Sequence, residues 1–227
     1  MLGDRYAPIT SSIGFLEAPL ETAGDALAAW RRELYPRVET GRPAEPFPEM
    51  LHRLEPLTGG SRPRELLVAT DSAWTAYFDC TLRGTDAVST IGYLTRRIRC
   101  RGLAVRAIPH TPARYGATQL ELFGPEQTDF INYVRTVSTT YDGNRWVFSA
   151  TGAPQPFERP ELYQARRVRD RFTIEHLAEY GERLGLRLFA PAFYGPEAVL
   201  VESAAPPAPG GHVMTLSQAQ QWLGIVG

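Results

Sequence analysis

Hydrophobic residues near the N-terminus recur with the spacing of a helix. Leu27, Trp30 and Leu34 lie three and four residues apart, so a helix would carry them on one face. Asp25 is the expected N-cap, and Pro36 cannot continue a helix. The pattern therefore predicts a helix that begins near Asp25 and ends before Pro36.

From residue 65 the pattern changes to short runs typical of strands. Residues 66–70 and 74–80 are predicted strands, 86–99 is a predicted helix with an apolar stripe, and 103–108 is a predicted strand. A strand, a helix and a strand within so short a span predict a right-handed crossover between two parallel strands.

The next segment has the pattern of an antiparallel meander. Predicted strands cover 118–123, 130–141 and 145–151, and Asp142-Gly143 between the last two is a strong hairpin signal. The apolar spacing then predicts a helix over 173–184, capped by Thr173, and two final strands over 186–193 and 198–201.

Together these elements predict an α+β fold on a mostly antiparallel sheet of about six to eight strands, with one βαβ-like crossover and helices packed against the sheet. Residues 1–22 are expected to be irregular, and a second short helix is expected from Pro48. The expected parts of the chain are a helical N-terminal extension over 1–64, an α+β core over 65–203, a Pro/Gly linker over 204–211 and a short C-terminal helix within 212–227.

Composition and charge narrow the range of functions. The chain has 227 residues and is 43% hydrophobic, which suffices for a core without disulfide bonds. Its 24 basic residues are balanced by 25 acidic ones, so nucleic acid is not an expected partner. All the basic residues are Arg, which excludes a P-loop lysine, a Schiff-base lysine and a pyridoxal-phosphate anchor.

No cofactor or metal site is expected from the motifs. The four histidines lack metal-ligand spacing, and the HExxH, GxSxG and GxGxxG patterns are missing. Cys80 and Cys100 are interpreted as thiols in a reducing cytoplasm, with a disulfide between them left open. The N-terminus does not resemble a secretory signal and no apolar run reaches the roughly 18 residues of a membrane span, so we expect a cytoplasmic protein.

One candidate site is a row of polar residues on the predicted strands. If the faces of these strands coincide, one side of the sheet carries Tyr77, Asp79, Arg106, Glu121 and Arg135. Arginine binds carboxylate or phosphate groups bidentately, so such a row could hold a polar ligand. The alternative is an ordinary solvated face with cross-strand ion pairs.

A second candidate is the pair of arginine clusters. Their members are Arg96, Arg97, Arg99 and Arg101 near the end of one predicted helix, and Arg166, Arg167, Arg169 and Arg171 before another. They could bind phosphate or an acidic partner. Alternatively they only solvate the surface and complement a helix dipole.

Three partial resemblances accompany these patterns. Residues 214–224 resemble the opening helix of excisionase-type helix-turn-helix proteins, with no recognition helix after it. The order of Arg106, Ser138-Thr139-Thr140 and a late Glu197 or Glu202 is similar to the Arg, Ser-Thr-Ser, Glu scheme of ADP-ribosyltransferases, without its usual Glu/Gln-x-Glu pair. Segments such as Gln119-Leu-Glu-Leu-Phe-Gly124 and Asp142-Gly-Asn-Arg-Trp-Val-Phe148 look like hypothetical proteins of high-GC bacteria over roughly 66–202, which implies no activity.

The function expected from the sequence is that of a non-enzymatic module that binds a protein partner, as immunity proteins of bacterial conflict systems do. Tyr, Trp and Arg commonly anchor protein interfaces, and the predicted strands carry Trp74, Tyr77, Tyr133, Tyr141 and Trp146. The alternative is an enzyme or small-ligand binder. Arg106 and Arg135 would then hold an anionic, nucleotide-like ligand, and Asp79 or Glu121 would act as the base. A third hypothesis assigns nucleic-acid binding to the arginine clusters.

Overall fold

The computed structural model describes residues 3–206 and 210–226. The strands are β1 (Ser12–Leu16), β2 (Val38–Gly41), β3 (Leu57–Thr58), β4 (Arg64–Thr70), β5 (Thr75–Asp79), β6 (Gly102–Ile108), β7 (Ala117–Phe123), β8 (Tyr133–Tyr141), β9 (Trp146–Thr151), β10 (Tyr194–Ser203) and β11 (Val213–Met214). Within the described part of the chain, nine of them form one sheet in the order β2-β10-β4-β5-β1-β6-β7-β8-β9, while β3 pairs with β11. The α+β class and the mostly antiparallel sheet are confirmed, with more strands than the six to eight expected.

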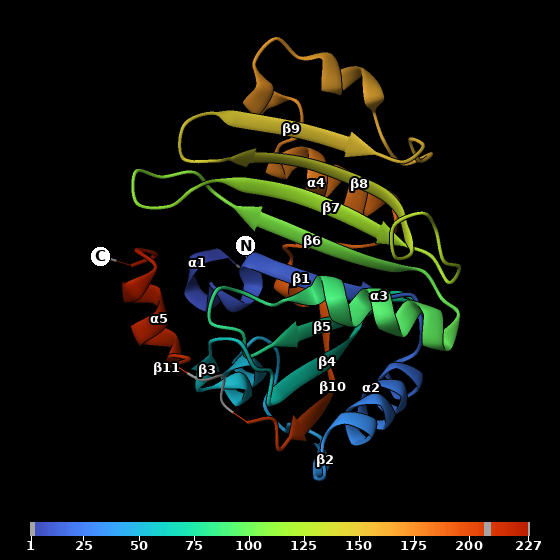
Figure 1. Ribbon diagram of the computed structural model, residues 1–227, viewed down its shortest axis with the longest axis vertical. Helices are drawn as coiled ribbons and strands as arrows, with labels where there is room; N and C mark the ends of the chain where they lie inside the picture. Colours follow the sequence, from blue (N-terminus) through green and yellow to red (C-terminus); the bar gives the residue numbers. More distant parts are fainter. Residues whose placement is uncertain (1–2, 207–209, 227) are drawn as a thin grey trace.

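Helices are distributed on both sides of this sheet (Figure 1). The α-helices are α1 (Gly3–Tyr6), α2 (Leu20–Leu34), α3 (Ala87–Ile98), α4 (Ile174–Arg183) and α5 (Leu216–Trp222). Short 3₁₀ turns are η1 (Ile9–Ser11), η2 (Glu49–Leu54), η3 (Pro160–Gln164), η4 (Val168–Asp170) and η5 (Pro191–Phe193).

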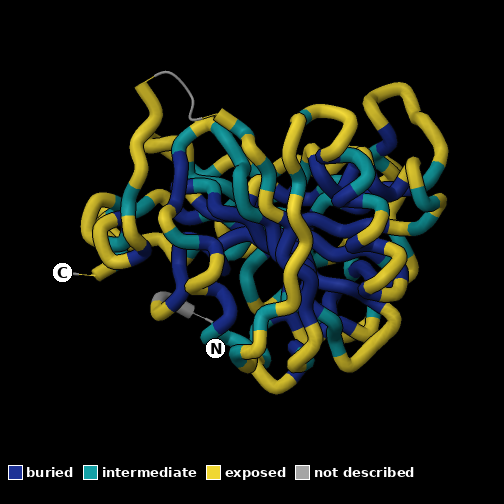
Figure 2. The backbone as a smooth tube through the Cα atoms, turned by 90° about the horizontal axis from the view of Figure 1, so that it is seen from below, coloured by how far each residue is buried: buried dark blue, intermediate teal, exposed yellow. Residues whose placement is uncertain are grey.

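The two faces of the sheet bury separate cores. On the face that carries α2 and α3, here called the helix face, Leu27 and Ile91 pack against Leu67 and Tyr77. The opposite, back face buries a larger cluster beneath η2, α4 and the 154–193 segment. Each fully buried Leu or Phe stabilises the fold by about 1.5–3 kcal/mol. In Figure 2 the buried segments accordingly run through the middle of the molecule and the exposed ones lie around them.

The helix face is covered over only part of its width. Helix α3 lies in front of β1 and β6 and α2 lies near β10, whereas no helix lies in front of β8 and β9 (Figure 1). This uncovered part of the helix face, over β8 and β9, is called the open half below.

The predicted crossover is present in a modified form. Strands β5 and β6 are both antiparallel to β1, which lies between them. They are therefore parallel to each other, and α3 joins them.

Residues 1–22 are not irregular throughout, because they contain β1, a buried central strand of the sheet. Gly14 breaks the apolar run in the sequence but is required for packing, since a Cβ there would lie 2.7 Å from Ile91 Cγ1.

Several predicted boundaries shift. Helix α2 begins at Leu20 after Pro19, five residues before the expected cap Asp25. The strand expected over 186–193 is wrong: this segment is a loop that ends in η5. Its buried residues Leu186, Leu188 and Phe193 fill the back core without pairing in the sheet.

The expected division of the chain does not coincide with the sheet. The segment over 1–64 contributes β1 and β2 to the same sheet as the 65–203 segment. Three residues of the expected linker, 207–209, lie outside the described residues. Helix α5 follows, and its capping box is formed by Thr215 and Gln218.

Candidate functional site

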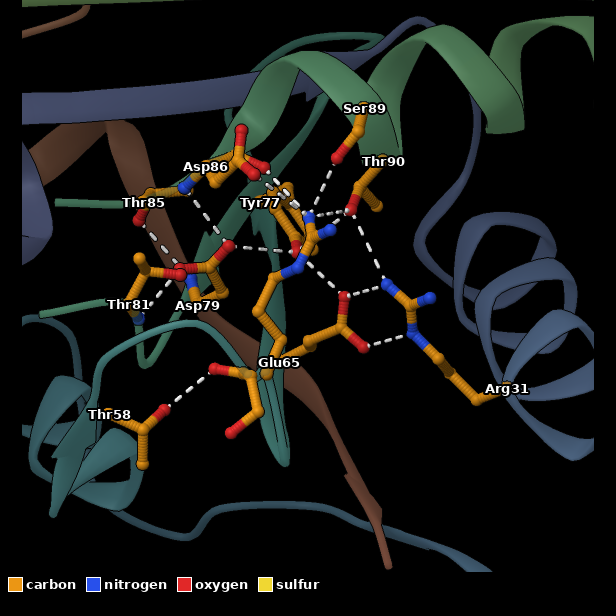
Figure 3. A network of polar contacts seen from close by, with 12 residues as sticks. Arg31, Thr58, Glu65, Tyr77, Asp79, Thr81, Thr85, Asp86, Ser89 and Thr90 are labelled. Carbon is orange, nitrogen blue, oxygen red and sulfur yellow. Dashed lines mark hydrogen bonds and ion pairs between the residues drawn. The ribbon is translucent and has the colours of Figure 1, made fainter. Parts of the chain in front are cut away.

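Tyr77 and Asp79 lie on the same face of β5, as the alternation predicted, but they are not accessible. Both are fully buried under α3, where Figure 3 shows them side by side. The Tyr77 hydroxyl donates to Asp79 Oδ2 at 3.2 Å and to Glu65 Oε1 at 2.7 Å. Asp79 also accepts from the backbone N–H groups of Thr81 and Asp86.

Two partners of this network were missed from the sequence. Arg31 reaches from α2 and donates to both carboxylate oxygens of Glu65, at 2.5 and 2.6 Å (Figure 3). Arg62 donates to the hydroxyls of Ser89 and Thr90 at the start of α3. One signal for Arg31 existed, because it follows Leu27 by four residues and so lies on the apolar face of the helix.

The network holds α2 and α3 to the sheet. Burial raises the pKa of Asp79 to about 6, against the hydrogen bonds from Thr81 that favour the carboxylate. Because Tyr77 and Asp79 have no exposed surface and their polar atoms are paired, neither can reach a substrate. The expected role of Asp79 as a base therefore has no geometric support.

Arg106 and Glu121 do face an accessible cavity on the helix face. Arg106 pairs with Ser12 on one side and with Gln119 on the other, and Glu121 follows Gln119 by two residues on β7. A cavity of about 250 Å³ is lined by Ser12, Arg106, Gln119, Glu121 and the first turn of α3. A second cavity, of about 530 Å³, shares Gln119 and Glu121 and continues over β8 to Gly152.

The two adjoining cavities are together called the double cavity below. Their environment shifts the pKa values of Glu121 and Tyr133. Burial raises the pKa of the Glu121 carboxyl, which the Arg106 guanidinium partly opposes and the Asp86 carboxylate reinforces. Burial also raises the pKa of Tyr133 to about 12, with contributions from Glu121 and Asp86. The Glu121 region is thus a partly desolvated site near negative charge.

Arg135 is not part of this face, contrary to expectation. It pairs with Leu122 on the back face, where it is 3% exposed and its Nη2 lies 2.8 Å from Glu158 Oε2. A β-bulge between Leu122 and Phe123 shifts the register, so Tyr133 and Arg135 do not share the face that simple alternation predicts. Arg106 and Arg135 therefore cannot hold one anion together.

Several members of the two arginine clusters form ion pairs with separate acidic residues. Arg97, Arg99 and Arg101 pair with Glu33, Glu126 and Glu17, which belong to three different parts of the chain. In the second cluster Arg169 pairs with Asp170 and the Arg171 Nε donates to the Ala165 carbonyl, whereas Arg166 and Arg167 are exposed. The exposed Arg96 completes the first cluster. Neither cluster forms a continuous basic surface with its charges unpaired.

An exposed apolar feature was missed from the sequence. The predicted strand from Phe130 begins only at Tyr133, and the loop over 124–132 presents Phe130, 69% exposed, and Ile131, 48% exposed. The fully buried Asn132 side chain fixes this loop by donating to the carbonyls of Gly92 and Gly124 and to the Thr95 hydroxyl. No local sequence pattern identifies an asparagine two of whose partners, Gly92 and Thr95, lie 40 and 37 residues away.

Comparison of the chain with protein-family models, curated proteins and solved structures found no match. The order that resembles ADP-ribosyltransferases does not converge, because Glu197 and Glu202 lie on β10, four strands from Arg106 on β6. The segment that resembles an excisionase helix packs on its own chain, where the Leu216 N–H donates to Glu55. Among the described helices, none combines the length and the hydropathy that crossing a bilayer requires.

Proposed function

We propose that this chain is a non-enzymatic module that binds a protein partner through the 124–132 loop and the adjoining open half of the helix face. The observation that carries the proposal is the fixed exposure of Phe130 and Ile131 beside a cavity of about 530 Å³. One side of the Phe130 ring stacks on Tyr133, with the ring centroids 5.7 Å apart, while most of the side chain stays in solvent. An exposed aromatic side chain of this kind is a common anchor of protein interfaces.

The backbone conformation of the 124–132 loop also supports a role in binding a partner. Ile131 has a φ of +57°, in the left-handed region that β-branched residues rarely adopt. Thr128 and Asn132 hold this conformation through hydrogen bonds to the loop backbone. Such strain costs of order 1–3 kcal/mol and is concentrated at functional sites, where it places a side chain in advance of binding.

The charge of the loop indicates the chemistry of the partner. Residues 124–132 include no basic residue and two acidic ones, Asp129 and Glu126, of which Glu126 pairs with Arg99, and Glu121 lies in the adjoining cavity. Complementary potentials guide association and orientation at interfaces. We therefore propose a partner with an apolar pocket for Phe130 and a basic rim. An immunity-like role, in which that partner is a toxin, is one function of this kind.

The proposal is tested by capture from the native cell extract with matched variants. Phe130→Ser removes the apolar anchor, and Leu34→Ser removes a comparably exposed apolar side chain at the end of α2. We expect one stoichiometric partner to be retained by the unchanged protein and by Leu34→Ser, and lost with Phe130→Ser. Direct titration of the purified partner should then show at least a tenfold weaker Kd for Phe130→Ser, about 1.4 kcal/mol.

The proposal is wrong if Phe130→Ser captures the same proteins as the unchanged chain. It is also wrong if the captured partner binds equally well after both substitutions, since the surface would then lie elsewhere.

A further inference from the structure

Five polar side chains on the helix face have no hydrogen-bond partner among the described residues, and all of them line the double cavity. They are Ser12 on β1, Arg106 on β6, Gln119 and Glu121 on β7, and Tyr133 on β8. Elsewhere this fold pairs its buried charges closely, as Arg31 with Glu65 and Arg135 with Glu158. The concentration of unpaired groups in one place therefore needs an explanation.

Ser12 is the most constrained of the five. Ser12 is only 7% exposed and lies opposite Arg106 in the sheet, where it lines the smaller cavity. Its hydroxyl makes no hydrogen bond to a described residue and opens onto the cavity, so it can donate to an acceptor atom of a ligand there.

Opposite charges lie at the two ends of the set. Arg106 and Ser12 line the smaller cavity together with Ala87 and Val88, in the first turn of α3. Asp86 and Glu121 also line this cavity, and the Asp86 carboxylate is paired with Arg62, with 3.6 Å between Oδ2 and Nη1. Arginine and the N-terminal turn of a helix both favour an anion. Beyond Gln119, the larger cavity is lined by Glu121, Asp129 and Tyr133, which favour a cation.

The two central charges do not neutralise each other directly. Arg106 and Glu121 are close enough for Arg106 to lower the pKa of Glu121, yet they form no ion pair within 4.0 Å. Their strands are neighbours, and Glu121 follows Gln119, the residue opposite Arg106, by two positions on β7. A ligand that carries both charges could bridge the two groups.

We propose that this double cavity binds a small zwitterion that bears a carboxylate and an ammonium group. The carboxylate accepts hydrogen bonds from the Arg106 guanidinium and the Ser12 hydroxyl. The ammonium donates to the Glu121 carboxylate, with Gln119 between the two ends and with Phe130 and Val134 against the carbon chain. The smaller cavity, about 250 Å³, lies just below the range for drug-sized ligands, which fits a compact molecule.

The test is a calorimetric titration of the unchanged protein with zwitterions of increasing length: glycine, 4-aminobutanoate and 6-aminohexanoate. Butanoate and butylamine are the matched analogues with one charge each. We expect at least one zwitterion to bind ten times more tightly than either analogue, since both charged contacts must form together. Because this comparison uses the unchanged chain, it does not depend on the folding of any variant.

Two variants assign the contacts, and a third is the control. Arg106→Gln and Glu121→Gln should each weaken binding of that zwitterion at least tenfold, while Arg145→Gln, on the exposed turn before β9, should leave it unchanged. Glu121→Gln should also abolish the rise in affinity with pH that accompanies ionisation of Glu121, whose pKa is raised.

Two outcomes would overturn the proposal. Equal binding of butanoate, unaffected by Glu121→Gln, would define a simple anion site. No heat of binding for any zwitterion at millimolar concentration would show that the unpaired groups are only hydrated. Neither outcome bears on capture of a protein by the 124–132 loop, which is a separate measurement.

Discussion

Arg31 on α2 and Glu65 on β4 form a two-point ion pair inside the protein, with their side chains 5% and 1% exposed. The Nε and Nη2 atoms of the guanidinium each donate to one carboxylate oxygen, and the Tyr77 hydroxyl donates to the same carboxylate. The pair therefore joins a helix to the sheet at a point where no water is available to replace either partner.

Arg31→Met should destabilise the fold by about 3–5 kcal/mol, because it leaves the Glu65 charge buried without its partner. Chemical denaturation measures the change. The double variant Arg31→Met/Glu65→Gln should recover part of the loss, since neither charge of this buried pair then remains. In contrast Arg42→Met, which breaks the exposed pair with Glu21, should cost less than about 1 kcal/mol. Equal losses for the two single variants would show that burial does not determine the strength of the pair.

The pKa of Asp79 predicts how stability depends on pH. This pKa is about 6 in the folded protein, raised from 3.8, so folding favours the protonated carboxyl. The contribution of Asp79 to the free energy of unfolding is therefore greatest below about pH 4 and is lost as the pH rises through about 6. The loss amounts to about 3 kcal/mol.

Asp79→Asn removes this titration. The stability of the unchanged protein minus that of Asp79→Asn should fall between pH 4 and pH 6.5 and stay constant above, as followed by urea denaturation. Asp71→Asn, at an exposed pair with Arg187, is the control for the substitution itself. A difference between the unchanged protein and Asp79→Asn that rises with pH would mean that hydrogen bonds to the carboxylate outweigh its burial.

Part of the polar site could be predicted from the sequence, because alternation along a strand fixes which side chains share a face. Tyr77 and Asp79 face together for this reason, and so do Gln119 and Glu121. Arg135 could not be placed in the same way. A single extra residue at the bulge before it reverses the alternation, and the sequence contains no local sign of the bulge.

The fold itself was predictable wherever the pattern was local. The α3 helix and the β8–β9 hairpin carry their own period and turn residues. Strand β1 has neither a long apolar run nor a turn signal. Its place between β5 and β6 depends on pairing with residues at least 59 positions away. Such long-range pairing is a property of the whole fold, which single-sequence patterns do not report.

Gly14→Ala tests the close approach of α3 to β1. A Cβ at this position would lie 2.7 Å from Ile91 Cγ1 and 3.1 Å from Ala87 Cβ, so α3 would have to move away from the sheet. We expect a loss of about 1–3 kcal/mol in the free energy of unfolding. Gly41→Ala is the matched control on β2, where a Cβ meets nothing within 4 Å, and stability should change by less than about 0.5 kcal/mol. Similar behaviour of both variants would indicate that α3 is not closely packed.

Substitution of Ile131, whose backbone is strained, should change stability and partner binding in opposite directions. Asparagine tolerates a φ of +57° far better than a β-branched side chain does, and Ile131 is 48% exposed, so Ile131→Asn loses little burial. We expect a gain of about 1 kcal/mol, which raises Tm by about 2–4 °C in a protein of this size. The same variant should bind the captured partner more weakly than the unchanged chain, because an apolar contact is lost. Ile131→Val, which keeps both the strain and most of the apolar surface, should change neither quantity appreciably. If Ile131→Asn lowered Tm, the Ile131 side chain would have to stabilise the monomer, and its exposure could no longer be assigned to a partner.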